Sequence, residues 1–551
     1  MTQFTQLKDK NVLVLGLGAS GLAMARWCAR SGAQVTVADS RENPPQLEAL
    51  RRDVPSAHFV CGPLDASLLA GRSISRVCKS PGLTPDIAGA ITHAITQTVA
   101  HATTDARNDA TIGIHSTTNN IANYQEGTLA TGELGLFSEA LSDLKASRGY
   151  SPAVLAVTGT NGKTTVTSLA GQLVARAGKT VAVAGNIGPT LLDTLSSCLD
   201  TDMLPEVWVI ELSSFQLDGI EGTPSYEPTA ATVLNITQDH LDWHGSLEKY
   251  AAAKANVFGK QALMLLNRED PRVMAMLPAP SMQGRVKDRV PQRDYITFGG
   301  DMPQRPGDFG IEEVNGMVWL VRGLDADGTK RKRNEASEEL YMQRLMPADA
   351  LRIRGRHNAV NALAALALAA SAGCSLAPML FGLREYRGEP HRVEPVGIVN
   401  GVEFFDDSKG TNVGATVAAL NGLAGTGSEP GAAGSHRKLI VILGGDGKGQ
   451  DFSPLAAPVA RYVRAVVLIG RDAGLVRAAL ASTGVPLINA ASMQQAVLLA
   501  NGQAVAGDAV LMSPACASLD MFDNYVHRAA VFREAVAQIA ASAGVELEGA
   551  A

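Results

Sequence analysis

The sequence AVTGTNGKTT, residues 156–165, follows an apolar run and ends in a lysine and two threonines. A strand that enters a glycine loop before a helix predicts a phosphate-binding loop, because backbone N–H groups and the helix terminus attract phosphate oxygens. Lys163 would neutralise the β and γ phosphates, and the Thr164 hydroxyl could hold Mg²⁺. The strict motif has another glycine where this chain has Val157, so a simple glycine turn before a helix is the alternative.

The segments around this loop predict the fold class. Short β-branched runs alternate with helical stretches along the whole chain, which favours α/β domains with parallel sheets. At 551 residues the chain is too long for a single core. We expect three domains: a Rossmann-like domain at 1–150, a P-loop ATPase-like domain at 151–388, and a second Rossmann-like domain at 389–551.

Three segments interrupt this alternation and are interpreted as insertions. Residues 92–130 are rich in Thr, Ala, Asn and His, 280–310 in Pro, Arg and Gly, and 424–437 in Gly, Ser and Ala. The longest apolar run, 359–372, contains Asn361 and is too short to span a bilayer, so it predicts a buried helix.

Composition excludes several function classes. A net charge of −6 and a pI near 6.0 argue against a nucleic-acid partner. The six cysteines form no CxxC pair, which favours reduced thiols over a disulfide framework or a zinc ribbon. The N-terminus lacks the apolar core of a signal peptide, so we expect a cytoplasmic protein without a membrane span.

Polar residues follow several strands of the second domain. Glu211 ends the run EVWVIE, and a carboxylate at the carboxyl edge of a parallel sheet is a natural Mg²⁺ ligand. His240 and His244 could form an HxxxH zinc pair, although no third ligand of suitable type is evident. Lys254 lies on a helical stretch and would ordinarily be a surface lysine.

The first domain contains a second glycine loop, GLGASG at 16–21, with Asp39 at the end of the next strand. This pattern is a dinucleotide fingerprint, and a nicotinamide cofactor is one interpretation of it. The loop itself predicts only a bound diphosphate, because the glycines and the helix terminus do not contact the rest of a ligand.

Motifs spread over nearly the whole chain resemble those of the Mur ligases, which add amino acids to the peptidoglycan precursor. In the central part these are GTNGKT (159–164), GNIG (185–188), ELSSFQL (211–217), NITQDHLDWH (235–244) and YAAAK (250–254). Further along are RGRHNAVNALAALALA (354–369), EPHRVE (389–394), DDSKGTN (406–412), GGDGKGQDF (444–452) and SPACASLDMF (513–522). The match is best to the members that add D-glutamate.

The resemblance implies roles for individual residues. The implied ATP-binding residues are Gly159, Thr160, Asn161, Gly162, Lys163, Thr164, Thr165, Asn186, Arg392, Asp407 and Lys409. The implied catalytic residues are Lys163, Glu211, His240 and Lys254. Magnesium would be held by Thr164, Glu211, His240 and a Lys254 that is carbamylated in this family. The UDP-linked substrate would contact Gly18, Ser20, Gly21, Asp39, Ser40, Ser80 and Gly82. D-Glutamate would contact His240, Thr411, Lys448, Ser513 and Phe522.

The implied activity is an ATP- and Mg²⁺-dependent addition of D-glutamate to UDP-N-acetylmuramoyl-L-alanine through an acyl phosphate, by a protein expected to be a monomer. A Mur ligase for another amino acid is the first alternative, although the DNPR-type string of the diamino-acid members is absent. A nicotinamide-dependent oxidoreductase would leave GTNGKT and GGDGK without a role. A regulatory nucleotide sensor would not need Glu211, His240 and Lys254 on the nucleotide side.

Overall fold

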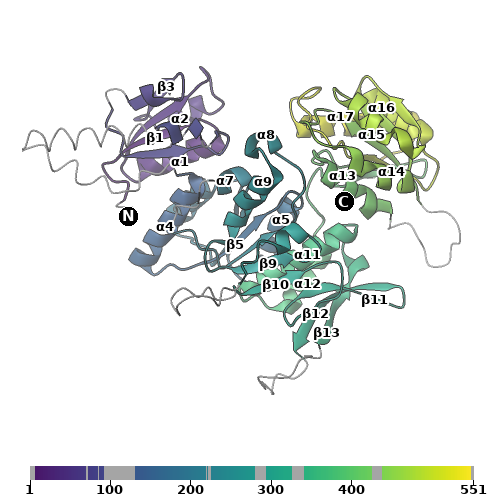
Figure 1. The fold of residues 1–551 in the computed structure, drawn as a ribbon, viewed down its shortest axis with the longest axis horizontal. Coiled ribbons are helices and arrows are strands. Elements are labelled where there is room, and N and C mark those ends of the chain that lie inside the picture. The colour runs from purple at the N-terminus through teal and green to yellow at the C-terminus, as the bar shows by residue number, and fades with distance from the viewer. Residues whose placement is uncertain are drawn as a thin grey trace, which may run out of the picture.

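The computed structural model describes residues 6–69, 72–84, 86–87, 89–91, 131–218, 220, 225–279, 293–325, 340–424 and 437–547. The expected insertion at 92–130 lies outside these residues, as do 280–292 and 425–436 of the other two. Figure 1 shows three lobes, with the N-terminal and C-terminal lobes on either side of the central one. Each lobe is built on its own sheet.

The N-terminal lobe has four parallel strands in the order β3-β2-β1-β4. They are β1 (Asn11–Leu15), β2 (Gln34–Asp39), β3 (His58–Cys61) and β4 (Arg76–Lys79). The helices are α1 (Ala19–Arg30), α2 (Leu47–Asp53) and α4 (Glu133–Arg148). Because the four strands are parallel, the glycine loop that follows β1 lies at the carboxyl edge of the sheet.

The central lobe has nine strands in the order β13-β12-β11-β10-β9-β8-β5-β7-β6. The predicted strands are confirmed as β5 (Ala153–Thr158), β6 (Val181–Gly185), β7 (Val207–Glu211), β8 (Ala230–Val233) and β9 (Leu263–Asn267). The sheet continues through β10 (Tyr295–Phe298), β11 (Phe309–Val314), β12 (Met317–Asp325) and β13 (Leu340–Pro347), of which the last three pair antiparallel.

One sequence interpretation is wrong in this lobe. Residues 295–298 and 309–310 belong to strands of the main sheet, whereas the composition of 280–310 predicts an insertion. The short run Tyr295–Phe298 has β-forming residues, but the Pro, Arg and Gly around it obscure its pattern.

Helices cover the central sheet on both faces. They are α5 (Lys163–Arg176), α6 (Leu191–Asp200), α7 (Ser214–Leu217), α8 (Leu241–His244), α9 (Leu247–Ala255), α10 (Pro271–Met274), α11 (Arg356–Ser371) and α12 (Leu376–Glu385). The predicted buried helix is confirmed as α11, in which every residue from Ala362 to Ala369 is buried. No helix in the described ranges is both long and apolar enough to cross a bilayer.

The C-terminal lobe has six strands in the order β14-β15-β19-β16-β17-β18. They are β14 (Glu394–Val399), β15 (Val402–Asp406), β16 (Leu439–Gly444), β17 (Val463–Ile469), β18 (Leu487–Asn489) and β19 (Ala509–Met512). Only β14 pairs antiparallel. The helices are α13 (Val413–Ala424), α14 (Ala456–Tyr462), α15 (Ala473–Leu480), α16 (Met493–Gln503) and α17 (Tyr525–Ser542).

The hydrophobic cores connect the lobes unequally. One cluster of buried side chains contains residues of both the N-terminal and the central lobe, where α1 and α4 pack on α6. The two clusters on the faces of the C-terminal sheet contain only residues from Val393 onward. The C-terminal lobe therefore has a core of its own and meets the central lobe mainly through polar contacts.

Candidate active site

The predicted phosphate loop lies between β5 and α5. Gly162 has φ +84°, and a Cβ there would lie 2.8 Å from Asn361 Oδ1, so only glycine fits. Lys163 is the first residue of α5, and its Nζ donates hydrogen bonds to the carbonyls of Gly159 and Thr160, each over 2.8 Å. Burial lowers the pKa of Lys163. The loop has the shape of a phosphate cradle, with its lysine folded across it.

A carboxylate with a spare oxygen stands beside this loop. Glu211 ends β7, which pairs with β5, and is buried. Asn186 Nδ2 donates to Glu211 Oε1 over 2.7 Å. Among the described residues, Glu211 Oε2 is buried and has no hydrogen-bond partner. Such an oxygen is costly when unpaired, and it is a ligand type that Mg²⁺ prefers, so this residue fits a magnesium site.

Lys254 is not a surface lysine. It lies on α9 with 1% of its surface exposed, and its Nζ donates to Thr158 Oγ1 over 3.3 Å. The Nζ atom also lies 4.7 Å from the centroid of the Tyr250 ring. Burial, and then the charge of Lys163, hold the pKa of Lys254 well below its ordinary value. A lowered pKa favours the neutral amine, which is the nucleophilic form needed for reaction with CO₂.

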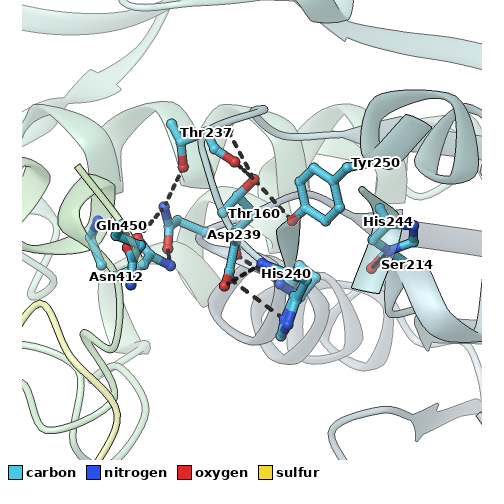
Figure 2. A network of polar contacts seen from close by, with 12 residues as sticks. Thr160, Ser214, Thr237, Asp239, His240, His244, Tyr250, Asn412 and Gln450 are labelled. Carbon is cyan, nitrogen blue, oxygen red and sulfur yellow. Dashed lines mark hydrogen bonds and ion pairs between the residues drawn. The ribbon is translucent and has the colours of Figure 1, made fainter. Parts of the chain in front are cut away.

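His240 and His244 differ in their surroundings (Figure 2). His240 has φ +52° and precedes α8, with its Nε2 3.6 Å from Asp239 Oδ2. Burial lowers the pKa of His240, an effect that Asp239 partly offsets. His244 is buried, with Nε2 3.0 Å from Ser214 Oγ and its ring stacked on Phe215. Because His244 is bonded to Ser214, the zinc-pair interpretation has no support.

The predicted catalytic charges lie near one another. Burial lowers the pKa of both Lys163 and Lys254, and the carboxylates of Glu211 and Asp239 partly offset this in each. Lys254 and Lys163 both act on the pKa of His240. The carboxyl edge of the central sheet thus brings together the residues predicted from separate motifs.

The connection between the central and C-terminal lobes contributes to this edge. Arg392 donates a short hydrogen bond from its guanidinium to Thr164 Oγ1, although the two residues belong to different lobes. Lys409 places its Nζ 3.9 Å from the centroid of the Tyr525 ring. Burial, with a further effect of Arg392, lowers the pKa of Lys409 to about 8.

Asp407 follows β15 and is buried. Its Oδ2 accepts a hydrogen bond from Ser513 Oγ over 2.6 Å, and its Oδ1 accepts from the backbone N of Val393 over 3.2 Å. Burial raises the pKa of Asp407 to about 7. This carboxyl group therefore changes its charge near neutral pH.

Only some of the residues predicted to bind D-glutamate lie next to one another. A Cβ on Gly410, which precedes Thr411, would lie 2.9 Å from Ser513 Oγ, so the loop and Ser513 are adjacent. Lys448 is exposed in the loop after β16 and has φ +49°. Phe522 packs edge-on against His527, with 5.8 Å between centroids. Within the described part of the chain, no hydrogen bond or ring contact joins Lys448 or Phe522 to the loop that contains Gly410 and Thr411.

The N-terminal glycine loop is tightly closed. A Cβ on Gly21 would lie 2.0 Å from the carbonyl oxygen of Gly16, so the helix packs directly on the turn. Ser80 lies against this turn, with its Oγ 4.0 Å from the position of a Cβ on Gly18. A Cβ on Gly82 would meet open space, so local packing does not require that glycine.

Two of the polar residues predicted for the UDP-linked substrate, Asp39 and Ser20, already have partners within the protein. Asp39 accepts hydrogen bonds from the backbone N of Leu17 over 2.7 Å and from the backbone N of Arg41 over 2.9 Å. The Arg41 guanidinium also bonds both oxygens of Asp39 and, with these N–H groups, lowers the pKa of that carboxyl to about 2. Ser20 hydrogen-bonds the buried Glu133, and Ser40 is exposed.

A cleft of about 130 Å³ adjoins the phosphate loop and is lined by residues that the motifs did not single out. Its lining includes Asn358 and Asn361 of α11, and Asn361 Nδ2 donates to Asn358 Oδ1 over 3.3 Å. Two amides spaced by three residues share one face of a helix, and this spacing could have identified them. Arg392, Asp407 and Lys409 line the same cleft from the other lobe.

The predicted magnesium residues do not form a closed ligand cluster. In the described ranges, the only three His, Cys, Asp or Glu ligand atoms within 4.8 Å of one another belong to His391, Glu394 and Asp406. That group is paired internally and with Arg533. Mg²⁺ commonly uses one or two carboxylates with water and substrate phosphates, so an incomplete set at Glu211 is compatible with it.

A phosphate loop in the middle one of three α/β lobes places the chain among the multidomain nucleotide-binding α/β proteins. Comparison with known families is more specific. Residues 10–102 match the MurD-like N-terminal domain of Mur ligases, residues 157–287 the Mur ligase middle domain, and residues 391–516 the Mur ligase glutamate ligase domain. The chain belongs to the Mur ligase family, as the motifs predicted.

Individual relatives are similar over their full lengths. The chain is 65% identical over 547 residues to a UDP-N-acetylmuramoylalanine--D-glutamate ligase from Albidiferax ferrireducens, covering 99% of each chain. It is 52% identical over 553 residues to the ligase of the same name from Ralstonia nicotianae, covering 99% of this chain and 100% of the other.

Solved structures agree on the fold. UDP-N-acetylmuramate-alanine ligase MurC from Thermotoga maritima superposes with a TM-score of 0.51 at 19% identity, over 96% of this chain and 99% of that one. MurF ligase from Thermotoga maritima in complex with ADP gives a TM-score of 0.51 at 14% identity, over 98% and 97% of the two chains. The predicted three-domain α/β fold is confirmed.

Proposed function

We propose that the chain is an ATP-dependent ligase that joins D-glutamate to UDP-N-acetylmuramoyl-L-alanine in the synthesis of the peptidoglycan precursor. The observation that carries this proposal is the 65% identity, over 99% of both chains, to a ligase of that name. The arrangement of Lys163, Glu211 and Lys254 at one sheet edge supports it, because these are the residues to which the family motifs assign the chemistry.

The proposed work is divided among three domains. The domain at 1–150 would bind the UDP end of the substrate at the loop around Gly18 and Ser80. The domain at 151–388 would bind ATP, and the domain at 389–551 would bind D-glutamate and contribute Arg392, Asp407 and Lys409 to ATP. The proposed boundaries, at 150 and 388, would lie in the connections before β5 and before β14.

The reaction must activate a carboxylate, which is a poor electrophile. ATP would transfer its γ-phosphoryl group to the carboxylate of the substrate, and the amine of D-glutamate would then displace phosphate to form an amide. Lys163 and Arg392 would offset the negative charge on the transferred group, a contribution made by position and electrostatics. Mg²⁺, held by Thr164, Glu211, His240 and a carbamylated Lys254, would supply further positive charge.

The remaining residues would bind and orient D-glutamate. His240, whose pKa burial lowers, would orient the incoming amine or the acyl phosphate as a neutral imidazole. Lys448 is exposed, so it could pair with a carboxylate of D-glutamate. Thr411, Ser513 and Phe522 would contact the rest of that amino acid. A charged group left unpaired in a closed site is costly, so such a pair discriminates between amino acids.

A phosphate-release assay tests the proposal. The purified protein with ATP, Mg²⁺ and UDP-N-acetylmuramoyl-L-alanine should release phosphate only when D-glutamate is added. Equal release with L-glutamate or L-alanine would refute the assignment. Lys163→Ala should abolish release while leaving binding of the UDP-linked substrate intact, and Lys260→Ala, exposed before β9, is the matched control.

No observation favours the nicotinamide alternative. An acidic residue at the position of Asp39 would contact a ribose in that class of enzyme. Here the Asp39 carboxylate is hydrogen-bonded to Leu17 and Arg41, which bears equally on a ribose and on the UDP end, and the domain matches to Mur ligases are what favour the ligase.

A further inference from the structure

Two amide side chains join the phosphate loop to the C-terminal lobe. Asn161 Nδ2 donates to Asn412 Oδ1 over 3.2 Å, and Asn412 Nδ2 donates to Asn161 Oδ1 over 3.0 Å. Figure 2 shows Asn412 and Gln450 of the C-terminal lobe facing the loop that carries Thr160. The reciprocal pair uses a donor and an acceptor from each carboxamide, which a carboxylate or a hydroxyl could not reproduce.

Each member of this pair is fixed within its own lobe. The backbone N of Asn161 donates to Asn235 Oδ1 over 2.8 Å, and Asn235 Nδ2 returns a bond to the Asn161 carbonyl over 3.1 Å. Asn412 is buried, and its Oδ1 also accepts from the backbone N of Ala415 over 2.9 Å, at the start of α13. The pair therefore connects two rigid groups.

The backbone of the C-terminal lobe approaches closely at the same place. A Cβ on Gly414 would lie 2.9 Å from Thr237 Oγ1 and 3.1 Å from Asn161 Nδ2. Val413, one residue earlier, donates its backbone N to Gln450 Oε1 over 3.1 Å. The start of α13 thus packs against the nucleotide loop, and the amide pair joins the two at this contact.

The position of Asn412 in its loop gives the contact a consequence. Asn412 directly follows Thr411, which is proposed to contact D-glutamate, and lies three residues from Lys409, which is proposed to contact ATP. A shift at Asn412 would move both neighbours, because the three share one short loop that Asp407 and Ser513 hold at its other end.

We propose that Asn412 is a positioning residue, which acts through Asn161 to align the Lys409–Thr411 loop with the nucleotide loop. This inference rests on the proposed function and extends it, since neither the motifs nor the family comparison assigns Asn412 a role. The pair couples the ATP half of the site to the D-glutamate half.

Three substitutions of Asn412 separate this role from helix capping. Asn412→Ser keeps an oxygen that can cap Ala415 but is too short to reach Asn161. Asn412→Asp keeps the cap and an acceptor for Asn161 Nδ2 but loses the donor. Asn412→Ala loses both functions. Ser492→Ala is the control, because Ser492 Oγ caps α16 by accepting from the Gln495 backbone N over 3.2 Å.

Steady-state kinetics on the full chain supply the test, with D-glutamate varied at saturating ATP. Asn412→Ser should lower kcat/KM for D-glutamate about tenfold, as loss of one or two hydrogen bonds predicts, while its thermal midpoint stays close to that of wild type. Asn412→Asp should fall between Asn412→Ser and wild type. Asn412→Ala should also lower the thermal midpoint, whereas Ser492→Ala should lower the midpoint without changing kcat/KM.

A double-mutant cycle identifies Asn161 as the partner. In an Asn161→Ala background, Asn412→Ser should cost less than twofold in kcat/KM for D-glutamate, because the bond is already absent. The same tenfold loss in both backgrounds would overturn the inference, and so would an unchanged Asn412→Ser single variant in an active enzyme. A wild-type protein without D-glutamate-dependent phosphate release would instead refute the proposed function itself, and this inference with it.

Discussion

At the scale of single residues, burial changes the charge of side chains that the motifs identify. Asp407 and Lys254 are buried and Lys409 is half-buried, and burial favours the neutral form of each: the pKa of the acid rises and the pKa values of the two lysines fall. The sequence identifies these residues as functional, but only their packing determines how much charge each carries at neutral pH.

Asp407 provides a prediction of pH dependence. Burial raises its pKa from 3.8 to about 7, so the folded protein holds a proton that the unfolded chain has released between these values. The contribution of this group to stability is therefore present at low pH and is lost as the pH rises toward 7. Asp407→Asn should gain about 2–3 kcal/mol of stability relative to wild type between pH 5 and pH 8, at about 1.36 kcal/mol per pKa unit.

Thermal unfolding midpoints of both proteins across this range check the prediction. Asp349→Asn, at an exposed carboxylate, is the control and should track wild type. A gap between Asp407→Asn and wild type that stays constant with pH would contradict the raised pKa.

Lys254 provides a prediction of covalent modification. The Lys254 amine is buried, and burial together with the charge of Lys163 holds its pKa well below the ordinary value, so it should react with CO₂, and the carbamate would then serve as a metal ligand. Wild-type protein in ¹³C-bicarbonate should show a carbamate carbon signal that Lys254→Gln lacks and Lys260→Gln keeps. Lys254→Gln should also lose activity about 100-fold, the scale for a damaged metal site. Identical spectra for wild type and Lys254→Gln would exclude carbamylation.

At the scale of elements, the phosphate loop between β5 and α5 depends on two glycines with positive φ. They are Gly159, with φ +151°, and Gly162, with φ +84°. Gly162→Ala would strain the backbone at φ +84° and place a methyl group 2.8 Å from Asn361 Oδ1. We expect ATP binding to weaken by more than tenfold. Gly178 is the matched control, since it has φ +87° but a Cβ there meets open space.

Isothermal titration with a non-hydrolysable ATP analogue measures both variants. Gly178→Ala carries the same backbone strain without the steric contact, so it should lose stability and keep its affinity. Equal affinity in Gly162→Ala and wild type would show that the loop tolerates a side chain.

The elements also show which parts of the fold the sequence could predict. Strands β5–β9 were predicted because each is an apolar run that ends in glycine or polar residues, the pattern of a buried parallel strand. The pair β12–β13 was missed, because few of its residues are fully buried and charged types are mixed with apolar ones. Asn161 and Asn412 are 251 residues apart, and no local pattern reports a contact that depends on how two lobes meet.

At the scale of the whole molecule, the three lobes are joined by different kinds of contact. The N-terminal lobe shares a hydrophobic core with the central lobe, and α1 adds ion pairs from Arg26 to Asp193 and from Arg30 to Asp200. The C-terminal lobe contacts the phosphate loop through Arg392 and Asn412. A small polar interface between separate cores permits relative motion of domains, so movement should be concentrated at the C-terminal lobe.

This difference leads to a prediction about closure. ATP would lie between the phosphate loop and the residues Arg392, Asp407 and Lys409, which line one cleft from opposite lobes. A ligand that contacts both sides should therefore draw the C-terminal lobe inward, which would exclude water from an acyl phosphate that water would otherwise hydrolyse. Small-angle scattering should show a smaller radius of gyration with a non-hydrolysable ATP analogue and UDP-N-acetylmuramoyl-L-alanine together than without ligand.

Arg392→Ala should reduce this compaction, because Arg392 is the residue of the connection that contacts Thr164. The UDP-linked substrate alone should change the profile little, since its proposed site lies on the lobe that already shares a core with the centre. An unchanged profile with both ligands would mean that the lobes are already in their reactive arrangement, and closure would then have no part in excluding water.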